Sequence, residues 1–303
     1  MLRDALDDFL LALQADGASP NTTRWYKEKL RRVVEAIGED KPVEEVSIHD
    51  LRAFVADLRA RKSRYSDHRF RPEVRGGLSP SCIHGYVKAI RRFFRWLVAE
   101  GVIEENPAAR LKLPRLPRQP PKGVSLSDVR KLLGAASNPR DYALVLFLID
   151  TGCRVGEICG LRMGDLALAE GMARVRGKGR KERVVMFSEV TAEALAAWLE
   201  LRPDGWDEIF VGTRGPLTPD GVRQVLRRLK RKAGVTGRCN PHSFRHAFAR
   251  EYLLNGGDLA SLADLLGHAD VGVTKEFYSV FTRQELKEKH RRHSPLRRLF
   301  EQD

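Results

Sequence analysis

The sequence has few cysteines and no long uncharged apolar segment. Its four cysteines (Cys82, Cys153, Cys159 and Cys239) show no C-x-x-C spacing, so a zinc site is not expected. So few thiols are typical of a protein in a reducing compartment. No apolar run approaches the roughly 18–20 residues of a membrane span. Carboxylates interrupt residues 1–16, where a signal peptide needs basic and then apolar residues, so an intracellular protein is expected.

Nucleotide-binding motifs and acidic residues are also in short supply. The sequence contains neither GxxxxGK[ST] nor GxGxxG, so nothing supports nucleotide-driven chemistry. Only 40 Asp and Glu stand against 54 Lys and Arg, which gives a net charge of +14 and a pI near 9.9. This excess favours an anionic partner, with nucleic acid first and an anionic membrane surface second. The cations form no single amphipathic face with an aromatic side, which disfavours the membrane.

The length of 303 residues and the 42% hydrophobic content are enough for two domains, each with its own core. Residues 112–123 contain four prolines, and because proline fixes φ and lacks an N–H, this segment is expected to be an extended linker. The linker is basic, so it either crosses a phosphate backbone or is a solvated spacer. We therefore predict a first domain over 1–111 and a second over 124–303. Residues 1–113 account for +4 of the +14, so the second domain should dominate phosphate contact.

The first domain is expected to contain four helices. Ser19 and Ser79 each precede a proline, and each pair supplies an N-cap and a first-turn proline. Ser47 lies three residues before Asp50, which resembles a capping box at the start of another helix. The polar segment 63–78 ends in glycines and is expected to be a mobile loop.

Basic helix faces in this domain are candidates for contact with DNA, although each cation alone is also compatible with an ordinary solvated face. The candidates are Arg24, Lys27, Lys88, Arg91, Arg92 and Arg95.

The second domain is expected to open with a helix capped at Ser125 or Ser127, followed by an apolar helix over 142–150. Residues 173–178 and 182–187 flank glycines and predict a β-hairpin. The rest is expected to be helical over 190–202, 218–233, 242–254, 258–266 and 283–292. The predicted fold class is thus mainly α with a small antiparallel β-sheet.

Four segments of the second domain carry residues suited to phosphodiester chemistry. In TGCRVGEICGL, 151–161, we expect Arg154 and Glu157 on one helix face at i, i+3, where the carboxylate fixes the guanidinium. The segment RVRGKGRKERV, 174–184, places six basic residues around a glycine turn. Alone, the first is compatible with a surface ion pair and the second with a non-specific DNA-binding turn.

The other two segments supply imidazoles, a second arginine and a tyrosine. In PHSFRHAF, 241–248, His242 and Arg245 should share a helix face as an anion site. In LLGHADVGVTKEFYS, 265–279, His268 follows a helix-ending glycine and Tyr278 comes ten residues later. Each motif alone is also compatible with a structural role.

Together these residues suffice to attack a phosphodiester. Arginine forks bind the non-bridging oxygens and favour the charged transition state. Histidine can move the proton of the nucleophile, and lysine can protonate the leaving oxygen. Tyrosine, with an ordinary pKa near 10, needs such activation to act as a nucleophile. The cations do the work of metal ions, so neither metal nor cofactor is expected.

The ordered motifs T-G-x-R-x-x-E-x-x-x-L, G-K-G-x-K-E-R, P-H-x-x-R-H-x-F-A and L-G-H with a later tyrosine resemble the tyrosine recombinases of the phage integrase family, close to the Xer type. The helical domain before them resembles the SAM-like core-binding domain of that family, and the second its mixed α/β catalytic domain. By resemblance, the catalytic set is Arg154, Lys178, His242, Arg245, His268 and the nucleophile Tyr278, with Glu157 as a supporting acid.

The resemblance implies strand transfer without ATP. Tyr278 would attack the scissile phosphate to give a 3′-phosphotyrosyl link, while Lys178 protonates the leaving 5′-oxygen. Lys178 is preferred to Lys181 because it precedes the turn, and Tyr252 is a rival nucleophile that follows no L-G-H. Cys153 stands where a larger apolar residue is usual, which favours a packing role.

The implied partners are double-stranded DNA sites and further copies of the chain, in a tetramer that passes through a Holliday junction. The basic C-terminal tail either docks onto a neighbouring protomer or packs locally. A cytoplasmic, nucleoid-associated place is expected. On the hairpin, the expected DNA contacts are Arg176, Arg180 and Lys181.

Two other functions remain open at this point. A type IB topoisomerase shares the chemistry, and a DNA-binding protein with an inactive catalytic domain shares the fold. The intact six-residue set disfavours the inactive protein, and the short two-domain layout favours recombination. The sequence does not distinguish integration, excision and chromosome dimer resolution.

Overall fold

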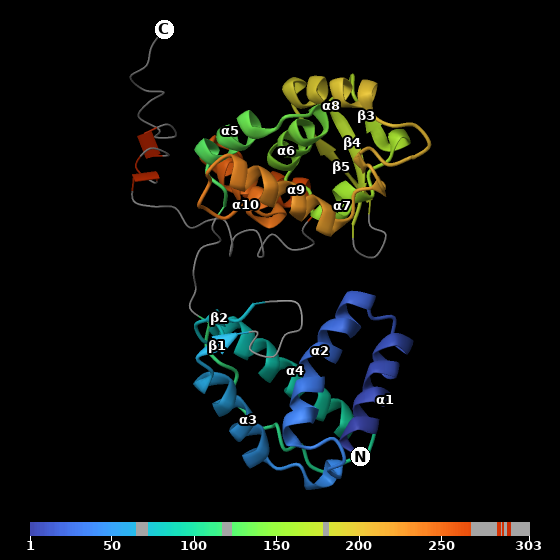
Figure 1. The fold of residues 1–303 in the computed structure, drawn as a ribbon, viewed down its shortest axis with the longest axis vertical. Helices are drawn as coiled ribbons and strands as arrows, with labels where there is room; N and C mark the ends of the chain where they lie inside the picture. The colour runs from blue at the N-terminus through green and yellow to red at the C-terminus, as the bar shows by residue number, and fades with distance from the viewer. Residues whose placement is uncertain are drawn as a thin grey trace. The chain divides into compact units, whose positions relative to one another are not determined.

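The computed structural model describes residues 1–64, 72–116, 123–177, 182–267, 284, 285, 287, 290 and 291. The chain divides into two compact units, Met1–Arg118 and Gln119–Asp303 (Figure 1). Each unit has its own hydrophobic core. Within the described ranges, no helix combines the length and the apolar character needed to cross a membrane.

The first unit contains four α-helices packed around α4. They are α1 (Leu2–Ala15), α2 (Pro20–Ile37), α3 (Ile48–Ala60) and α4 (Pro80–Ala99), with a 3-10 turn η1 (Val43–Glu45) before α3. The predicted caps are confirmed, because Ser19 Oγ accepts from the Thr22 N–H and Ser79 Oγ from the Cys82 N–H, each at 3.2 Å. One face of α4, including Phe93 and Phe94, is buried against the other three helices. Its opposite face is therefore left for solvent or a partner.

The expectation that residues 63–78 form a loop is partly wrong. Its ends pair as a two-residue antiparallel ribbon of β1 (Ser63–Arg64) and β2 (Val74–Arg75). Two residues are too few to show an alternating pattern, so the sequence carries no signal for this pairing. Residues 65–71, between the two strands, lie outside the described part.

The second unit is a helical domain with a small three-stranded antiparallel sheet. Its first half comprises α5 (Leu126–Ala135), α6 (Pro139–Thr151), α7 (Val155–Cys159), η2 (Met163–Asp165), β3 (Leu166–Ala167), β4 (Met172–Arg176) and β5 (Glu182–Met186). Its second half comprises α8 (Glu189–Leu201), β6 (Val211–Gly212), β7 (Gly215–Pro216), α9 (Pro219–Lys232), α10 (Pro241–Leu254) and α11 (Leu259–Leu266).

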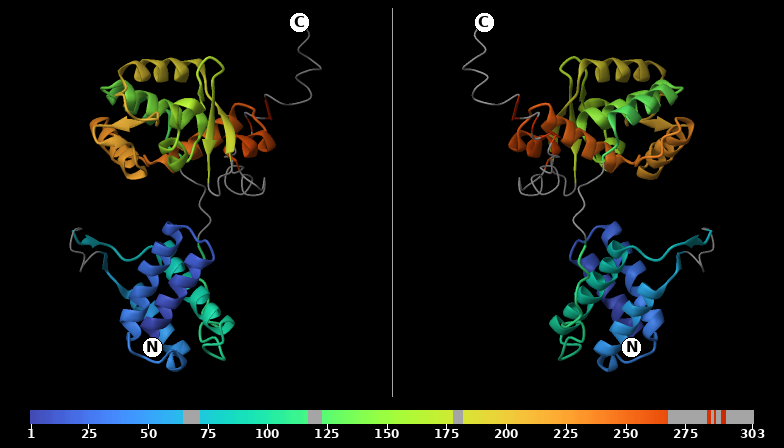
Figure 2. Two further views of the ribbon diagram at one scale, coloured as in Figure 1. Left: turned by 90° about the vertical axis from the view of Figure 1, so that its right-hand side faces the viewer. Right: turned by 90° about the vertical axis from the view of Figure 1, so that its left-hand side faces the viewer.

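The apolar helix α6 is central in this unit. It packs against α5, α8, α10 and β5, and Phe147 and Leu148 on it are fully buried. Strand β5 contacts α6 and also α11, so the sheet lies between these two helices, with the red α11 on the side away from the green α5 and α6 (Figure 2). This arrangement brings the hairpin, α10 and the end of α11 toward one another.

The predicted fold class, mainly α with a small antiparallel sheet, is confirmed. The hairpin forms as expected, with Arg174 opposite Val184 and Arg176 opposite Glu182. Ser125, rather than Ser127, caps α5 by accepting from the Asp128 N–H at 3.0 Å. Most of the expected helix over 283–292 lies outside the described residues.

The capping box at the start of α3 yields a pH-dependent prediction. The Ser47 N–H donates to Asp50 Oδ2 at 2.9 Å, and Lys41 Nζ donates to the same oxygen at 2.9 Å. These two bonds, the first being the stronger influence, lower the pKa of Asp50 from 3.8 to about 2. The bonded carboxylate therefore stabilises the fold above its ordinary pKa, and this stabilisation is lost as the pH falls through the folded value.

We expect Asp50→Asn to lower the free energy of unfolding by about 1 kcal/mol at neutral pH. The difference from the wild type should shrink toward zero as the pH approaches about 2, because the wild-type carboxyl is then protonated as well. Urea unfolding followed by circular dichroism at several pH values measures this difference. A gap that stays constant down to pH 2 would contradict the assignment.

Candidate active site in the second unit

Arg154 lies at the N-cap of α7 and not inside a helix. Its backbone N–H donates to Glu157 Oε2 at 2.7 Å, and its Nη1 donates to Glu157 Oε1 at 3.0 Å. The expectation that both residues share one helix face is therefore wrong, because Glu157 is the third helical residue and bonds back to the residue that begins the helix. The Arg154 side chain is 40% exposed, whereas that of Glu157 is 2% exposed. The guanidinium is thus held by a buried carboxylate and still reaches solvent.

A glycine makes the tight turn before Arg154 possible. Gly152 ends α6 with φ of +60°, in the left-handed region that favours glycine. A Cβ at this position would lie 2.5 Å from Phe248 Cδ1 of α10. The glycine of the T-G-x-R motif therefore permits both the turn and the close approach of α10.

A second arginine, Arg183 of β5, binds the same carboxylate. Its Nη1 and Nη2 donate to Glu157 Oε1 and Oε2 at 2.6 and 2.9 Å. Burial by itself would raise the pKa of Glu157, but the hydrogen bonds and charge of Arg183, with those of Arg154, outweigh it and hold the pKa below its ordinary value. Glu157 is therefore a carboxylate at neutral pH. Sequence reasoning missed this role of Arg183, because the two residues are 26 positions apart.

Arg245 is a buried cation of α10. Its Nη1 donates to the Gly152 carbonyl at 2.8 Å, and its Nη2 donates to the Leu266 carbonyl at 2.7 Å. The first contact joins α10 to the turn that precedes Arg154. The second joins α10 to the last residue of α11, two positions before His268. His242 lies one turn earlier on α10 and is exposed.

The environment of α10 is strongly positive. The pKa of His246 is lowered to about 4 by burial and then by the neighbouring His242, Arg245 and Arg238. His246 is therefore neutral at pH 7, in surroundings that disfavour any further positive charge. Such a concentration of cations suits the binding of an anion.

The structure thus assembles part of the predicted set. Arg154 and Glu157 are in direct contact, and Arg245 reaches their turn through the Gly152 carbonyl, with His242 on the same helix. The residues Lys178, Arg180, Lys181, His268 and Tyr278 lie outside the described part of the chain. In the part that is described, no three His, Cys, Asp or Glu side chains form a group that could hold a metal ion.

Two family models match the chain. One describes the phage integrase family and covers residues 124–284, and the other describes the phage integrase N-terminal SAM-like domain and covers residues 6–101. The chain belongs to the phage integrase family. The predicted family and the predicted activity of a site-specific tyrosine recombinase are confirmed.

Several relatives of the recombinase are named tyrosine recombinases of the Xer type. The tyrosine recombinase XerD of Listeria innocua is 31% identical and covers 97% of this chain and 99% of its own length. The tyrosine recombinase XerA of Thermococcus kodakarensis is 32% identical and covers 98% of both chains.

Solved structures share the fold of the recombinase. A crystal structure of XerA recombinase has a TM-score of 0.53 at 28% identity and covers 96% of this chain and 98% of its own. A lambda integrase tetramer bound to a Holliday junction has a TM-score of 0.71 at 21% identity and covers 91% and 77%. The second likeness supports the fold alone.

The predicted basic face of α4 exists in the recombinase. Lys88, Arg92 and Arg95 are exposed and Arg91 is half-buried. Among the described residues, none of these four has a carboxylate within 4 Å. Arg24 and Lys27 are likewise exposed on α2. These positions leave their charge available for a phosphate backbone.

Arg176 of β4 differs from these cations. Its Nη1 and Nη2 donate to Asp165 at 2.8 and 2.9 Å, and its Nε donates to Glu182 at 2.9 Å. Much of its charge is therefore balanced within the sheet, and a contact with DNA would compete with these carboxylates.

Helix α9 of the recombinase carries a basic face that was not among the predicted DNA contacts. Val222, Val225, Leu226 and Leu229 are buried, and the opposite face bears exposed cations. These cations are Arg223, Arg227, Arg228, Arg231 and Lys232. Arg223 and Arg228 pair with Asp220 and Asp141. The helical period of the run VRQVLRRLKRK is the signal that would have revealed this face.

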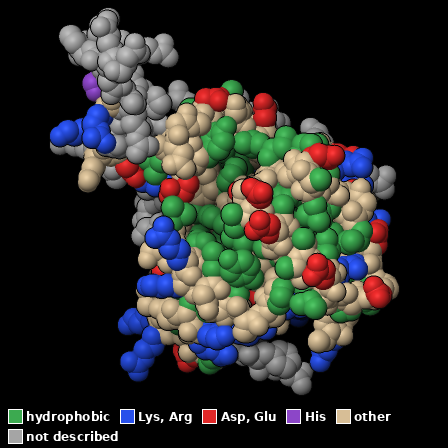
Figure 3. Space-filling model, turned by 90° about the horizontal axis from the view of Figure 1, so that it is seen from above, with side chains coloured by type: hydrophobic (Ala, Val, Ile, Leu, Met, Phe, Trp, Pro, Cys, Tyr) green, Lys and Arg blue, Asp and Glu red, His purple; other side chains and the backbone are tan. Residues whose placement is uncertain are grey.

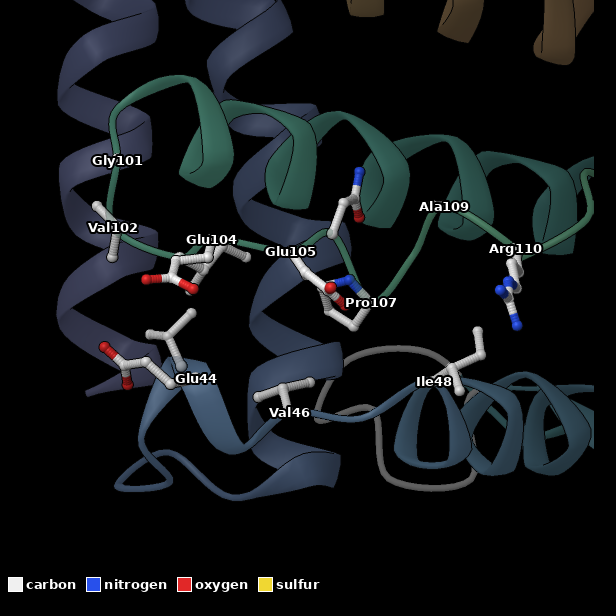
Figure 4. A pocket seen from close by; sticks show the side chains of 13 residues that line it. Glu44, Val46, Ile48, Gly101, Val102, Glu104, Glu105, Pro107, Ala109 and Arg110 are labelled. Atoms are coloured by element: carbon white, nitrogen blue, oxygen red, sulfur yellow. The ribbon is translucent and has the colours of Figure 1, made fainter.

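Two other surfaces do not suit phosphate. In the first unit, a groove of about 1000 Å³ lies between the η1 segment and residues 101–110, with Glu44 and Glu104 on its two sides (Figure 4). In the second unit, a hollow of about 500 Å³ beside α8 is lined mainly by apolar residues, among them Tyr142 and Val190, and its one charged lining residue is Glu193. Apolar side chains gather over this face, and Lys and Arg lie mainly toward its margin (Figure 3).

The position of Cys153 leads to a prediction about thiol reactivity. Its side chain is fully buried, and this burial raises its pKa to about 11. The thiolate is the reactive form, so Cys153 should be inert at pH 8 in the native protein. We expect iodoacetamide to leave Cys153 unmodified natively and to modify it in urea, as mass spectrometry of peptides would show. Rapid native labelling would exclude the packing role.

Proposed function

We propose that the recombinase cuts and rejoins double-stranded DNA at specific sites through a 3′-phosphotyrosyl intermediate, with Tyr278 as the nucleophile. This proposal rests on two arginines, Arg154 and Arg245, whose guanidiniums are both held at the turn between α6 and α7. Arg154 is fixed by Glu157 and reaches solvent, and Arg245 is fixed by the Gly152 carbonyl. Two such guanidiniums can bind the non-bridging oxygens of one phosphodiester and favour the charge that develops during attack.

The remaining residues complete the proton transfers. His242 is exposed one turn before Arg245, where it can move the proton of the attacking hydroxyl. Lys178 protonates the leaving 5′-oxygen, and His268 helps to hold the phosphoryl oxygens. Exchange of one phosphodiester link for another conserves bond energy, so the reaction needs no ATP. The reverse step with a 5′-hydroxyl of a partner strand completes strand transfer.

The two domains divide the work in this proposal. Residues 1–111 recognise DNA through the basic faces of α2 and α4, and residues 124–303 carry out strand transfer. The basic linker over 112–123 crosses the phosphate backbone between them. The cations of α4 support this division, because none of them has a carboxylate within 4 Å among the described residues. The exposed basic face of α9 adds Arg227 and Arg231 to the expected DNA contacts of the second domain.

Self-association is the final part of the proposal. A structural relative is described as a lambda integrase tetramer bound to a Holliday junction. We infer that this recombinase also acts as a tetramer on paired sites, with its basic C-terminal tail docked on a neighbouring copy, in the cytoplasm on the nucleoid. The apolar face beside α8 supports contact with another protein chain, because such a surface is costly to leave in water.

Substitution of Tyr278 by phenylalanine tests the nucleophile. We expect the variant to retain DNA affinity and to form no covalent adduct on a nicked suicide duplex, because only the attacking oxygen is removed. Adducts are detected by denaturing gel electrophoresis, and sequencing of their junctions in genomic DNA maps the site. Tyr252→Phe is the matched control, since Tyr252 packs against Phe248 on α10 and should remain active.

Persistent adducts from Tyr278→Phe would disprove the nucleophile assignment. Relaxation of any supercoiled plasmid without a site requirement would favour a topoisomerase instead.

Substitution of Arg92 or Arg95 by alanine tests the DNA face of α4. If each cation contacts one phosphate, the slope of log affinity against log salt should fall by about one for each substitution. Fluorescence anisotropy over a range of salt concentrations measures the slope. Arg3→Ala is the control, because Arg3 lies on α1, outside the two basic faces, is paired with Asp40 at 2.7 Å and should leave the slope unchanged. Equal slopes for all variants would remove α4 from the interface.

A further inference from the structure

Burial distinguishes Arg183 from Arg174 and Arg176, the other described cations of the hairpin, whose side chains are about half exposed. Its side chain is 13% exposed, and all three of its nitrogens donate. Two of them bind both oxygens of Glu157, and Nε donates to the Leu265 carbonyl at 3.0 Å. Arg183 is thus fixed inside the unit and does not extend toward DNA from the hairpin.

Through Glu157, Arg183 is one ionic contact away from Arg154. Glu157 Oε1 accepts from both guanidiniums, and Oε2 accepts from Arg183 Nη2 and from the Arg154 N–H. If Arg183 were removed, the buried carboxylate would keep only Arg154 as its cationic partner among the described residues. Because an underpaired buried charge is costly, Arg154 would then be drawn toward Glu157 or the carboxyl would take up a proton. Either change would alter the orientation of the Arg154 guanidinium toward the phosphate.

Arg183 also packs against the turn that leads to His268. Gly267 ends α11 with φ of +62°, and a Cβ there would lie 2.8 Å from Arg183 Cδ. The glycine of the L-G-H motif is therefore required by this arginine as well as by its left-handed backbone. The bond from Nε to Leu265 fixes the same helix end.

We propose that Arg183 is a positioning residue that sets the orientation of Arg154 and the place of the turn before His268. It does so from β5, the strand that follows the hairpin loop carrying Lys178. The Arg183 side chain thereby connects the hairpin, the turn at Arg154 and the end of α11. A shift of the hairpin would therefore move Arg154, which binds the phosphate. This inference rests on the proposed function, because it concerns the same phosphodiester.

The test compares Arg183→Gln with the wild type in the full-length protein, on a suicide duplex that carries the site mapped from covalent junctions. We expect cleavage to slow by about 100-fold, the usual effect of losing one well-placed donor to the transition state. DNA affinity should stay within about twofold, because it depends on many phosphate contacts. Arg183→Lys keeps the charge without the fork, so an intermediate loss of about tenfold is expected.

A neutral substrate distinguishes positioning from general damage. A methylphosphonate at the scissile position replaces one charged oxygen by a methyl group, so it depends less on a correctly placed Arg154. The loss in Arg183→Gln should shrink on this substrate to about tenfold or less, as it should in Arg154→Ala. Equal losses on both substrates, or unchanged cleavage of the ordinary substrate, would overturn the proposal.

Two variants besides Arg183→Gln keep the outcome clear. Arg174→Gln on the neighbouring strand is the matched control, since Arg174 is exposed and lies 3.6 Å from Asp165, and it should behave as the wild type. If Arg183→Gln does not fold, Arg183→Lys, which keeps a positive charge beside Glu157, carries the same test with its smaller expected loss on the charged substrate. A wild type that forms no adduct contradicts the proposed function, whereas active wild type and equally active Arg183 variants contradict only this inference.

Discussion

The buried carboxylate of Glu157 is the constraint on which the active site depends. A carboxylate at 2% exposure must be compensated, and it is compensated by two arginines and one backbone N–H. One of those arginines belongs to the turn after α6 and the other to the sheet. The charge at the centre therefore joins elements that hydrophobic packing alone would leave free to shift by small distances. A site that binds one phosphodiester needs that degree of order.

Local features of the sequence predicted local features of the structure. The caps at Ser19, Ser47 and Ser79 depend only on residues within one turn, and all three form. The hairpin of β4 and β5 was visible from two β-like runs around glycines. The ribbons made of two-residue strands were not visible, because so short a strand leaves no period in the sequence. Order of motifs, rather than any one motif, identified the family.

The site was predictable in its members and less so in its geometry. The sequence placed Arg154 and Glu157 together but on a helix face, whereas after the turn at Gly152 Arg154 is the N-cap residue that precedes α7. The contact of Glu157 with Arg183 is set by how the sheet packs against α7 and α11, which no local pattern encodes. Arg176 and Arg183 lie in the same basic run, yet Arg176 donates to Asp165 of η2 and Arg183 donates to Glu157 of α7.

Helix α11 ends against the arginines of the active site. The last carbonyls of a helix have no hydrogen-bond partners within the helix. Here Arg183 donates to the Leu265 carbonyl and Arg245 donates to the Leu266 carbonyl. The same side chains thus complete a helix terminus and, in Arg245, the proposed phosphate site. Loss of activity in an Arg245 variant consequently combines two effects, a missing charge and a frayed helix end next to His268. Selection for stability and selection for catalysis both act on Arg245, so a substitution at this position is disfavoured for two separate reasons.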